Sequence, residues 1–292
     1  MSLMGAVLGL GNIGASASLP VMEGKSALFK NFAGLNSIPI VLDTSDPDAI
    51  VETIVRIAPS FGAVNLEDIS APRCFEIERR LIEALDMPVM HDDQHGTAVV
   101  VLAALTNAVK VVGKAIESLK VVISGAGAAG VAVAEILLAA GVRDVVVLDS
   151  RGIIETGREN LPQHKADLAA RTNPRGLQGG AADALSGADV FVGVSSGTID
   201  TEIARTMANG AIVFALSNPD PEITPAEAAT FASVIATGRS DYPNQINNVL
   251  AFPGFFRGLL DAGATDITDE MLVVAAEAIA AAISEDELNA GY

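Results

Sequence analysis

The sequence predicts an α/β protein with two lobes, in which helices cover parallel sheets. Short apolar runs alternate with amphipathic stretches along the chain, which is typical of parallel strands connected by helices. Glycine-rich turns follow two of these runs. Aromatic residues make up only 4% of the chain and tryptophan is absent, so the core must be built from Ala, Val, Leu and Ile.

The apolar runs predict the strands. A first run at 6–8 stands at the beginning of the sequence. The later runs lie at 38–42, 62–66, 87–90, 119–124, 145–148, 190–194, 212–216 and 234–237.

Between the strands, amphipathic stretches predict helices at 47–57, 71–85 and 130–140. Pro47 suits the first turn of its helix, where no backbone N–H is needed. The stretch 96–112 is too apolar for a surface helix, and we interpret it as a spine between the lobes. The stretch 268–284 is rich in Ala and predicts a packing helix with Thr268 as its N-cap.

The lobe boundary is predicted near the end of the spine helix, because a new strand–helix–strand unit begins just after Gly113 and Lys114. We therefore expect a first lobe over residues 1–107 and a second lobe over 108–292.

Composition excludes several classes of protein. The 292 residues hold 18 Lys and Arg against 36 Asp and Glu, and this net charge of −18 argues against nucleic acids and anionic membranes as partners. The most apolar stretch, 98–109, falls short of the roughly 18 apolar residues of a membrane span, and we recognise no signal peptide. The single cysteine, Cys74, cannot form an internal disulfide, so we expect a cytoplasmic location.

The strongest local motif is a G-x-G-x-x-G turn made of Gly125, Ala126, Gly127, Ala128, Ala129 and Gly130. It follows one predicted strand and opens a helix, so its backbone can approach a pyrophosphate that sits at the helix N-terminus. Asp149 ends the next strand, where it would accept hydrogen bonds from a ribose and repel a 2′-phosphate. The motif predicts a Rossmann-type lobe that binds NAD in preference to NADP. A tight turn with a solvent-facing Asp149 is the alternative.

A second copy of the pattern, with Gly9, Gly11 and Gly14, has weaker context. Pro20 is expected to interrupt the helix that should follow, and no acidic residue ends a second strand at the expected distance. From the pattern alone we do not predict a nucleotide loop here.

Carboxylates follow two neighbouring strands. Glu67 and Asp68 come after one, and Asp92 and Asp93 after the next. Ligands of open parallel sheets bind at these strand ends, and clustered carboxylates suit a hard cation such as Mg²⁺ or Mn²⁺. Asp92 and Asp93 would point to opposite faces of a strand, so we do not expect both to bind one metal ion.

Capping is the alternative, with Asp93 at the helix near Gly96 and Asp68 or Ser70 at the helix near 71. The nearby His91 and His95 are expected in supporting or core roles.

Three further polar side chains are candidates. Lys25 lies just beyond the first glycine pattern, Asn218 follows a predicted strand, and Asn248 lies in an amide-rich segment. A buried amide at a strand end can hold a carboxylate or a nicotinamide, although ordinary turn formation explains Asn218 and Asn248 almost as well.

Taken in order, these segments resemble the malic enzyme family, in its shorter bacterial form, over about residues 6–282. The segments that carry the resemblance are VLGLGNIG (7–14), PVMEGK (20–25), NLEDISAPRCFE (65–76), HDDQHGT (91–97), GAGAAG (125–130), SNP (217–219), ATGRSD (236–241) and NNVLAFPG (247–254).

The resemblance implies oxidative decarboxylation of (S)-malate to pyruvate and CO₂ with NAD, or NADP, and a divalent metal ion. Lys25 matches the catalytic lysine and Asp92 the carboxylate that works beside it. Matches to the metal ligands are Glu67, Asp68 and Asp93. Asn218 matches an amide near nicotinamide and substrate, and Asn248 one near the substrate. The first glycine pattern then belongs to the substrate lobe, and a homodimer or larger homo-oligomer is expected.

The chemistry requires Lys25 to accept a proton from the malate hydroxyl, so its pKa must be lowered from about 10.4. The family also implies an acid that protonates the enolate carbon, a tyrosine in a segment before the first glycine pattern. The only tyrosines, Tyr242 and Tyr292, do not match it, and Ala6 stands where larger members have a substrate-binding arginine. We therefore expect the first lobe to be truncated.

Two alternatives follow from this departure. One is a non-catalytic protein that senses NAD or another ligand with the same fold. The other is an enzyme of a different substrate, such as an amino-acid dehydrogenase, which needs no metal ion.

Overall fold

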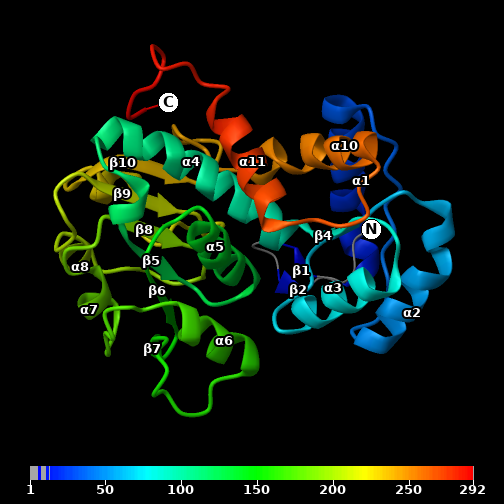
Figure 1. Ribbon diagram of the computed structural model, residues 1–292, viewed down its shortest axis with the longest axis horizontal. Helices are drawn as coiled ribbons and strands as arrows, with labels where there is room; N and C mark the ends of the chain where they lie inside the picture. Colours follow the sequence, from blue (N-terminus) through cyan, green and yellow to red (C-terminus); the bar gives the residue numbers. More distant parts are fainter. Residues whose placement is uncertain (1–5, 8–10, 13, 292) are drawn as a thin grey trace.

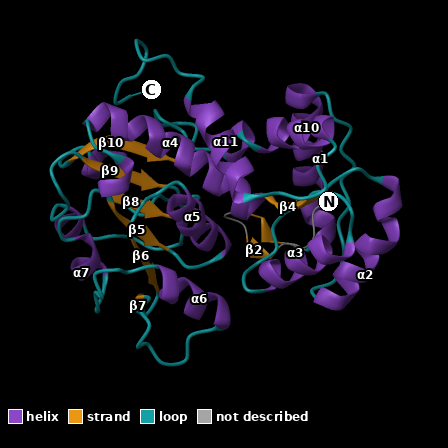
Figure 2. Cartoon of the chain, viewed as in Figure 1, coloured by secondary structure: helices purple, strands orange, loops and turns teal. Residues whose placement is uncertain are grey.

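The computed structural model describes residues 6–7, 11–12 and 14–291. Two lobes lie side by side in Figure 1, and Figure 2 shows their helices in purple and their strands in orange. The strands are β1 (Ala6–Val7), β2 (Gly11–Asn12), β3 (Val64–Leu66), β4 (Val89–His91), β5 (Lys120–Ser124), β6 (Asp144–Asp149), β7 (Gly152–Ile153), β8 (Val190–Gly193), β9 (Ala211–Ala215) and β10 (Ala232–Thr237). The helices are α1 (Ala15–Ala33), α2 (Pro47–Ile57), α3 (Arg73–Ala84), α4 (Thr97–Val112), α5 (Ala128–Ala139), α6 (Gln163–Arg171), α7 (Ala181–Leu185), α8 (Thr201–Ala204), α9 (Pro225–Ala228), α10 (Phe252–Ala262) and α11 (Asp269–Ala280).

The larger lobe is built on a six-stranded sheet with the order β10-β9-β8-β5-β6-β7. All neighbouring strands are parallel except β7, which runs antiparallel to β6. The chain moves outward from β5 to β6 and then returns to the other side of β5 with β8. This reversal opens a crevice at the carboxyl ends of β5 and β8, where Rossmann-type sheets bind their ligands. The predicted α/β class and parallel sheet are confirmed.

The smaller lobe contains two short sheets. In one, β3 and β4 are parallel and pair Leu66 with His91, so both strands end at the same edge. In the other, β1 and β2 form an antiparallel pair. Of the predicted strand at 6–8, Ala6 and Val7 form β1, and Leu8 lies outside the described residues.

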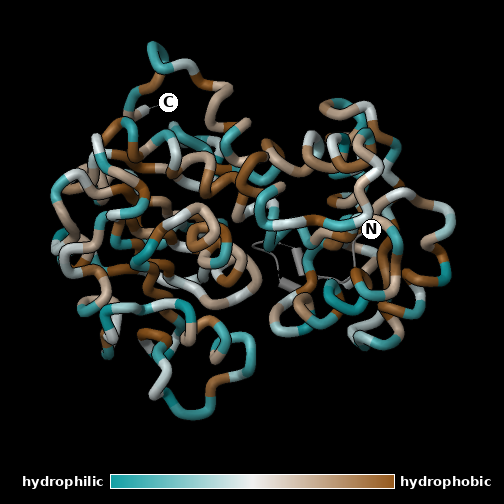
Figure 3. Tube along the Cα trace, in the orientation of Figure 1, coloured by the Kyte–Doolittle hydropathy of each residue, from teal (hydrophilic) through white to brown (hydrophobic). Residues whose placement is uncertain are grey.

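Apolar side chains cover both faces of the large sheet. One cluster joins α4, α5 and α11 to the sheet, and another joins α7, α8 and α9 to its opposite face. Figure 3 shows the hydrophobic stretches, α5 among them, gathered inside this lobe. The predicted packing helix is confirmed as α11, and Thr268 caps it by accepting a hydrogen bond from the Met271 N–H.

The helix predicted at 96–112 forms as α4, which is preceded by a π-helical turn at Asp92–Gly96, and its interpretation as a spine between the lobes stays a prediction. Together they form one helical stretch, Asp92–Val112, whose length and hydropathy alone meet the test for a membrane span. More than half of this stretch is buried inside the protein, and α4 packs on α5 and α11. The same pattern therefore fits the core helix of a folded lobe.

Two predictions about the smaller lobe are wrong. No strand forms at 38–42. The chain is irregular from 34 to 46, and the side chain of Ile38 is 57% exposed. Pro20 does not interrupt the first helix, since α1 continues through it to Ala33. Pro20 is the sixth residue of α1, so it removes one backbone hydrogen bond of the helix, and the packing of the buried Met22 and Phe29 offsets that loss.

The C-terminal part of the chain returns to the smaller lobe through α10, which lies beside α1 (Figure 1). Phe29 of α1 contacts Phe252 and Phe256 of α10, with ring centroids 4.8 and 5.6 Å apart. This aromatic contact ties the helix that carries Lys25 to the segment that carries Asn248.

We expect Phe256→Ala to lower the free energy of unfolding by about 3–5 kcal/mol, because it leaves a cavity in this buried contact. Phe32→Ala on α1 is the matched control: Phe32 is 70% exposed and Phe256 only 3%. The control should change stability by less than about 0.5 kcal/mol. Urea unfolding measures both, and equal losses would contradict the packing described here.

Candidate active site

The centre of the site is a lysine held between carboxylates at the edge of the small parallel sheet. Lys25 Nζ donates to Glu67 Oε2 at 2.5 Å and to Asp92 Oδ2. The same ammonium group lies 4.3 Å from the ring centroid of Phe252. The structure thus joins residues from α1, from the ends of β3 and β4, and from α10.

Asp92 is fully buried and lies in the π-helical turn after β4, not in a strand. Its Oδ2 also accepts a hydrogen bond of 2.6 Å from Asn248 Nδ2, which brings the predicted substrate amide to the lysine. The turn depends on Gly96, because a Cβ at that position would lie 1.9 Å from Asp92 Oδ1. Gly96 therefore makes room for the carboxylate that contacts Lys25.

The other carboxylates raise one another's pKa. Burial, followed by repulsion from Asp93, raises the pKa of Glu67 to about 7 and that of Asp68 to about 8. Burial and then repulsion from Asp92 raise the pKa of Asp93. Asp93 Oδ2 also accepts a hydrogen bond of 2.7 Å from the backbone N–H of Asp68. The prediction that carboxylates gather at this edge is confirmed.

The protonation of Lys25 differs from what its predicted role as a base requires. Burial alone would lower the pKa of Lys25, but attraction to Asp92 and Glu67 outweighs burial and raises that pKa. The lysine is therefore charged in this structure. To act as a base, it would need another positive charge that compensates its carboxylate partners.

The capping alternative is wrong for both acidic segments. Asp93 lies inside the π-helical turn, which leads into α4 without a side-chain cap from the described residues. In the same described part of the chain, no side chain caps α3, which begins after Pro72. Asp68 adopts a left-handed backbone with φ of 56°, which aspartate tolerates better than most residues.

Sequence reasoning missed Glu78, a buried carboxylate on α3 that hydrogen-bonds the π-helical turn at Asp92–Gly96 and the residue before it. It accepts hydrogen bonds from the backbone N–H of His91 at 2.7 Å, from Gln94 Nε2 at 3.1 Å and from His95 Nε2 at 3.1 Å. Burial would raise the pKa of Glu78, but His95 outweighs this and lowers it. Its position within an amphipathic helix gave no signal of this role. His95, expected in a supporting or core role, thus contacts the residue that anchors the turn.

The predicted glycine loop has the geometry of a ligand-binding turn. Gly125 has a φ of 124°, and a Cβ at Gly130 would lie 1.8 Å from the Gly125 carbonyl oxygen, so both positions need glycine. A Cβ at Gly127 would meet nothing within 4 Å among the described atoms. The N-terminus of α5 begins at this open side, and no side chain among the described residues caps it. A phosphate group could approach these N–H groups directly.

Asp149 ends β6 as predicted, but it does not face solvent alone. Its Oδ2 pairs with Arg158 at 2.5 Å and with Lys165 at 2.7 Å. Burial would raise the pKa of Asp149, but these hydrogen bonds lower it to about 2. The carboxylate is thus charged and already compensated by two cations.

A cavity of about 360 Å³ connects the two groups of residues. Its lining includes Ala129 from the glycine loop, Asp93 from the carboxylate cluster, and both Asn218 and Asn248. The structure therefore places the two predicted amides at one cavity between the lobes. Tyr242, exposed and 5.6 Å from the Arg239 guanidinium, is absent from this lining.

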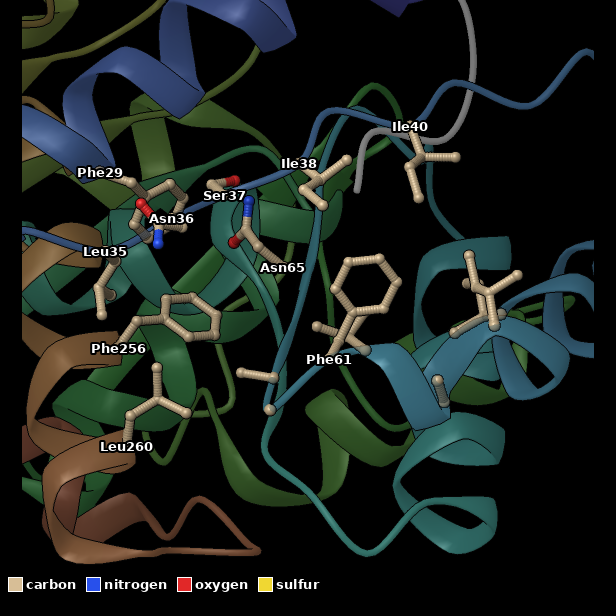
Figure 4. A pocket seen from close by; sticks show the side chains of 16 residues that line it. Phe29, Leu35, Asn36, Ser37, Ile38, Ile40, Phe61, Asn65, Phe256 and Leu260 are labelled. Carbon is tan, nitrogen blue, oxygen red and sulfur yellow. The ribbon is translucent and has the colours of Figure 1, made fainter.

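A second cavity, of about 240 Å³, lies in the smaller lobe between α1, α2 and α10 (Figure 4). Phe29, Phe61, Phe256 and Leu260 surround it, and Ile38 from the irregular segment closes one side (Figure 4). None of the predicted site residues lines this cavity. Its apolar walls do not suit a small dicarboxylate.

The first glycine pattern belongs to the smaller lobe. Gly14 precedes α1, and Gly11 lies in β2, while Gly9 is outside the described residues. Its helix carries Lys25 toward the carboxylates.

We expect the free energy of unfolding of the chelator-treated chain to fall as pH rises from 5 to 8. The pKa values of Glu67 and Asp92 are about 7, and that of Asp68 is about 8. These three pKa values exceed those of the unfolded chain, which are about 4. Between about pH 4 and the folded pKa values, the folded state therefore binds more protons than the unfolded state. The stability linked to them is complete below about pH 4 and is lost as pH rises through 7 and 8.

Urea unfolding at several pH values measures this slope. Asp92→Asn removes one titrating group and should make the slope shallower. A stability that increases over the same range would contradict the raised pKa values.

Comparison with known proteins gives a consistent result over the whole chain. The family model described as malic enzyme, N-terminal domain, matches residues 4–82, and that of the malic enzyme NAD binding domain matches residues 94–292. The NAD-dependent malic enzyme of Geobacillus stearothermophilus is 56% identical over 288 residues, which cover 98% of this chain and 60% of that protein. The bifunctional malic/malolactic enzyme of Bacillus subtilis is 55% identical over 290 residues, covering 98% of this chain and 71% of that protein.

An NADP-dependent malic enzyme of Halomonas elongata is 53% identical over 279 residues, covering 94% of this chain and 65% of that protein. Among solved structures, the NAD-dependent malic enzyme of Thermotoga maritima superposes with a TM-score of 0.93 at 46% identity. The match covers all of this chain and 79% of that one. The chain thus spans about three fifths to four fifths of the proteins it matches here.

Proposed function

The chain belongs to the malic enzyme family, and from this we propose that it carries the site that converts (S)-malate to pyruvate and CO₂ with a dinucleotide as hydride acceptor. The observation that carries the proposal is the buried contact of Lys25 with Asp92, which Asn248 links to the cavity beside the glycine loop. A proton-transfer group and a dinucleotide loop thus open on the same space.

We propose that Glu67, Asp68 and Asp93 hold a Mg²⁺ or Mn²⁺ ion. Among the described residues, no three His, Cys, Asp or Glu side chains are yet arranged as ligands. The chemistry of these residues fits such an ion, because hard carboxylate oxygens crowd together there and mutual repulsion raises their pKa values. Among the described residues, Lys25 is the cation that hydrogen-bonds this group, through Glu67. When bound, the ion would supply Lewis-acid chemistry, polarising oxygens of the substrate.

Lys25 and Asp92 are the proposed catalytic pair. Lys25 Nζ holds a proton between two carboxylates, and compensation of Glu67 would leave Asp92 as its main partner. The lower pKa that follows allows Lys25 to accept a proton from a substrate hydroxyl. Asn248 orients Asp92 and offers its amide to the substrate, and Asn218 lies across the cavity for substrate and cofactor.

Lys25→Ala should lower the rate of NADH formation from (S)-malate, NAD and Mn²⁺ by roughly 100- to 10,000-fold, the usual contribution of a general base. Lys30→Ala is the matched control, because Lys30 is exposed on the same helix and bonds only to Asn36 among the described side chains. Spectrophotometry at 340 nm follows the product. Activity close to that of the unmodified chain in Lys25→Ala would refute this assignment.

Calorimetry distinguishes catalysis from ligand sensing. Malate that binds only with Mn²⁺ and is then turned over supports the enzyme. Binding of NAD without any turnover supports the non-catalytic alternative, whereas EDTA-insensitive activity on an amino acid supports a dehydrogenase of another class.

We further propose a preference for NAD over NADP. Asp149 ends β6, where its carboxylate would accept hydrogen bonds from a ribose and repel a 2′-phosphate. Pairing with Arg158 and Lys165 reduces this repulsion but leaves the carboxylate in place. Both cofactors occur among the names of the relatives.

Asp149→Asn should lower the ratio of kcat/KM for NAD to kcat/KM for NADP by roughly three- to tenfold, because it removes the remaining repulsion between the Asp149 carboxylate and the 2′-phosphate of NADP. Asp144→Asn, at the opposite end of β6 and paired with Arg175, is the control and should leave the ratio unchanged. The values of kcat/KM for the two cofactors give the ratio. A clear NADP preference of the unmodified chain would overturn the proposal.

We propose a cytoplasmic location, which a single buried free cysteine, Cys74, supports. A homodimer or larger homo-oligomer stays a prediction from the family resemblance.

A further inference from the structure

One buried carboxylate of the larger lobe has no part in the chemistry described so far. Glu222 follows β9 and is only 2% exposed, yet none of the ion pairs among the described residues includes it. A buried carboxyl group without a cationic partner is costly unless its oxygens are satisfied by hydrogen bonds. Apolar packing therefore does not explain why a carboxyl group is buried at position 222.

The two oxygens of Glu222 bridge two separate loops. Oε1 accepts a hydrogen bond of 3.1 Å from the backbone N–H of Ser195, in the loop after β8. Oε2 accepts one of 3.2 Å from the backbone N–H of Ser217, in the loop after β9. The side chain thus joins the carboxyl ends of two adjacent parallel strands, and its own carbonyl accepts the Ile199 N–H at 2.8 Å.

Strand β8 ends in a glycine where the Glu222 carboxyl group packs against it. A Cβ at Gly193, the last residue of β8, would lie 2.3 Å from Glu222 Cδ. A side chain at this position would displace the carboxyl group from its two hydrogen bonds.

The two bridged loops form one wall of the cavity between the lobes. Val194, Ser195 and Ser196 line it from the loop after β8, and Leu216, Ser217 and Asn218 line it from the loop after β9. The glycine loop and Asn248 lie on the other sides of the same cavity. A dinucleotide whose pyrophosphate rests on the glycine loop would extend its nicotinamide half along this wall.

We propose that Glu222 is a positioning residue for the nicotinamide half of the dinucleotide: it ties the loops after β8 and β9 together and so sets the wall on which that half rests. The inference rests on the proposed function. Glu222 itself does not touch the cofactor in this arrangement, since the loops stand between them.

The test compares NADH with ADP-ribose, which keeps the adenosine, pyrophosphate and ribose groups but lacks nicotinamide. The dihydronicotinamide ring of NADH is itself fluorescent, so its binding can be read directly. In Glu222→Gln, the amide NH₂ would face one of the two backbone N–H donors, so one loop is released. We expect its affinity for NADH to fall roughly tenfold while its affinity for ADP-ribose stays within about twofold.

Glu227→Gln is the matched control, because Glu227 is an exposed residue of a helix-capping pair with Thr224 and lies outside the cavity. It should change neither affinity. An equal loss of NADH and ADP-ribose binding in Glu222→Gln, or no loss at all, would overturn the inference. If the unmodified chain binds neither ligand, the proposed function itself fails.

A second measurement needs no variant and decides the question if Glu222→Gln does not fold. In the unmodified chain, NADH should slow the amide hydrogen exchange of the segments 194–197 and 216–219, and ADP-ribose should not. Equal protection of both segments by the two ligands, or no protection by NADH, would exclude this role of the bridged loops.

Discussion

The structure of the site depends on one buried charge interaction, that of Lys25 with Asp92 and Glu67. Among the described residues, four carboxylates gather at the ends of β3 and β4, and the Lys25 ammonium group hydrogen-bonds two of them, so negative charge is in excess. Burial disfavours this excess charge and therefore raises the pKa values of Glu67, Asp68 and Asp92. Charge balance in the site therefore requires protons or a cation, and the same balance decides whether Lys25 is a base.

The surrounding fold holds this interaction in place from several directions. Glu78 anchors the π-helical turn from α3, and Gly96 leaves space for Asp92. The contact of Phe29 with α10 holds the lysine helix against the segment of Asn248. Residues more than 150 positions apart in the chain thus meet at Asp92.

Much of the fold could be predicted because hydrophobic periodicity and glycine-rich turns are local signals. The five parallel strands of the large sheet, the glycine loop and the Thr268 cap are examples. The errors arose where tertiary packing overrides local preference. Pro20 is tolerated because the buried Met22 and Phe29 hold α1 against the lobe, and residues 38–42 form no strand because no neighbouring strand pairs with them in the described part of the chain.

By itself the sequence determined the fold class and the order of the motifs, since residue type and spacing along the chain are enough to specify these, and its resemblance to a known family supplied the candidate site residues. Only the tertiary structure decided their protonation and partners. The pKa of Lys25 depends on which charges surround it, and the charge of Asp149 is compensated by Arg158 and Lys165 from a later segment. The bridging role of Glu222 likewise requires two loops to meet in space, because electrostatics and hydrogen bonding depend on distance in three dimensions and not on position in the chain.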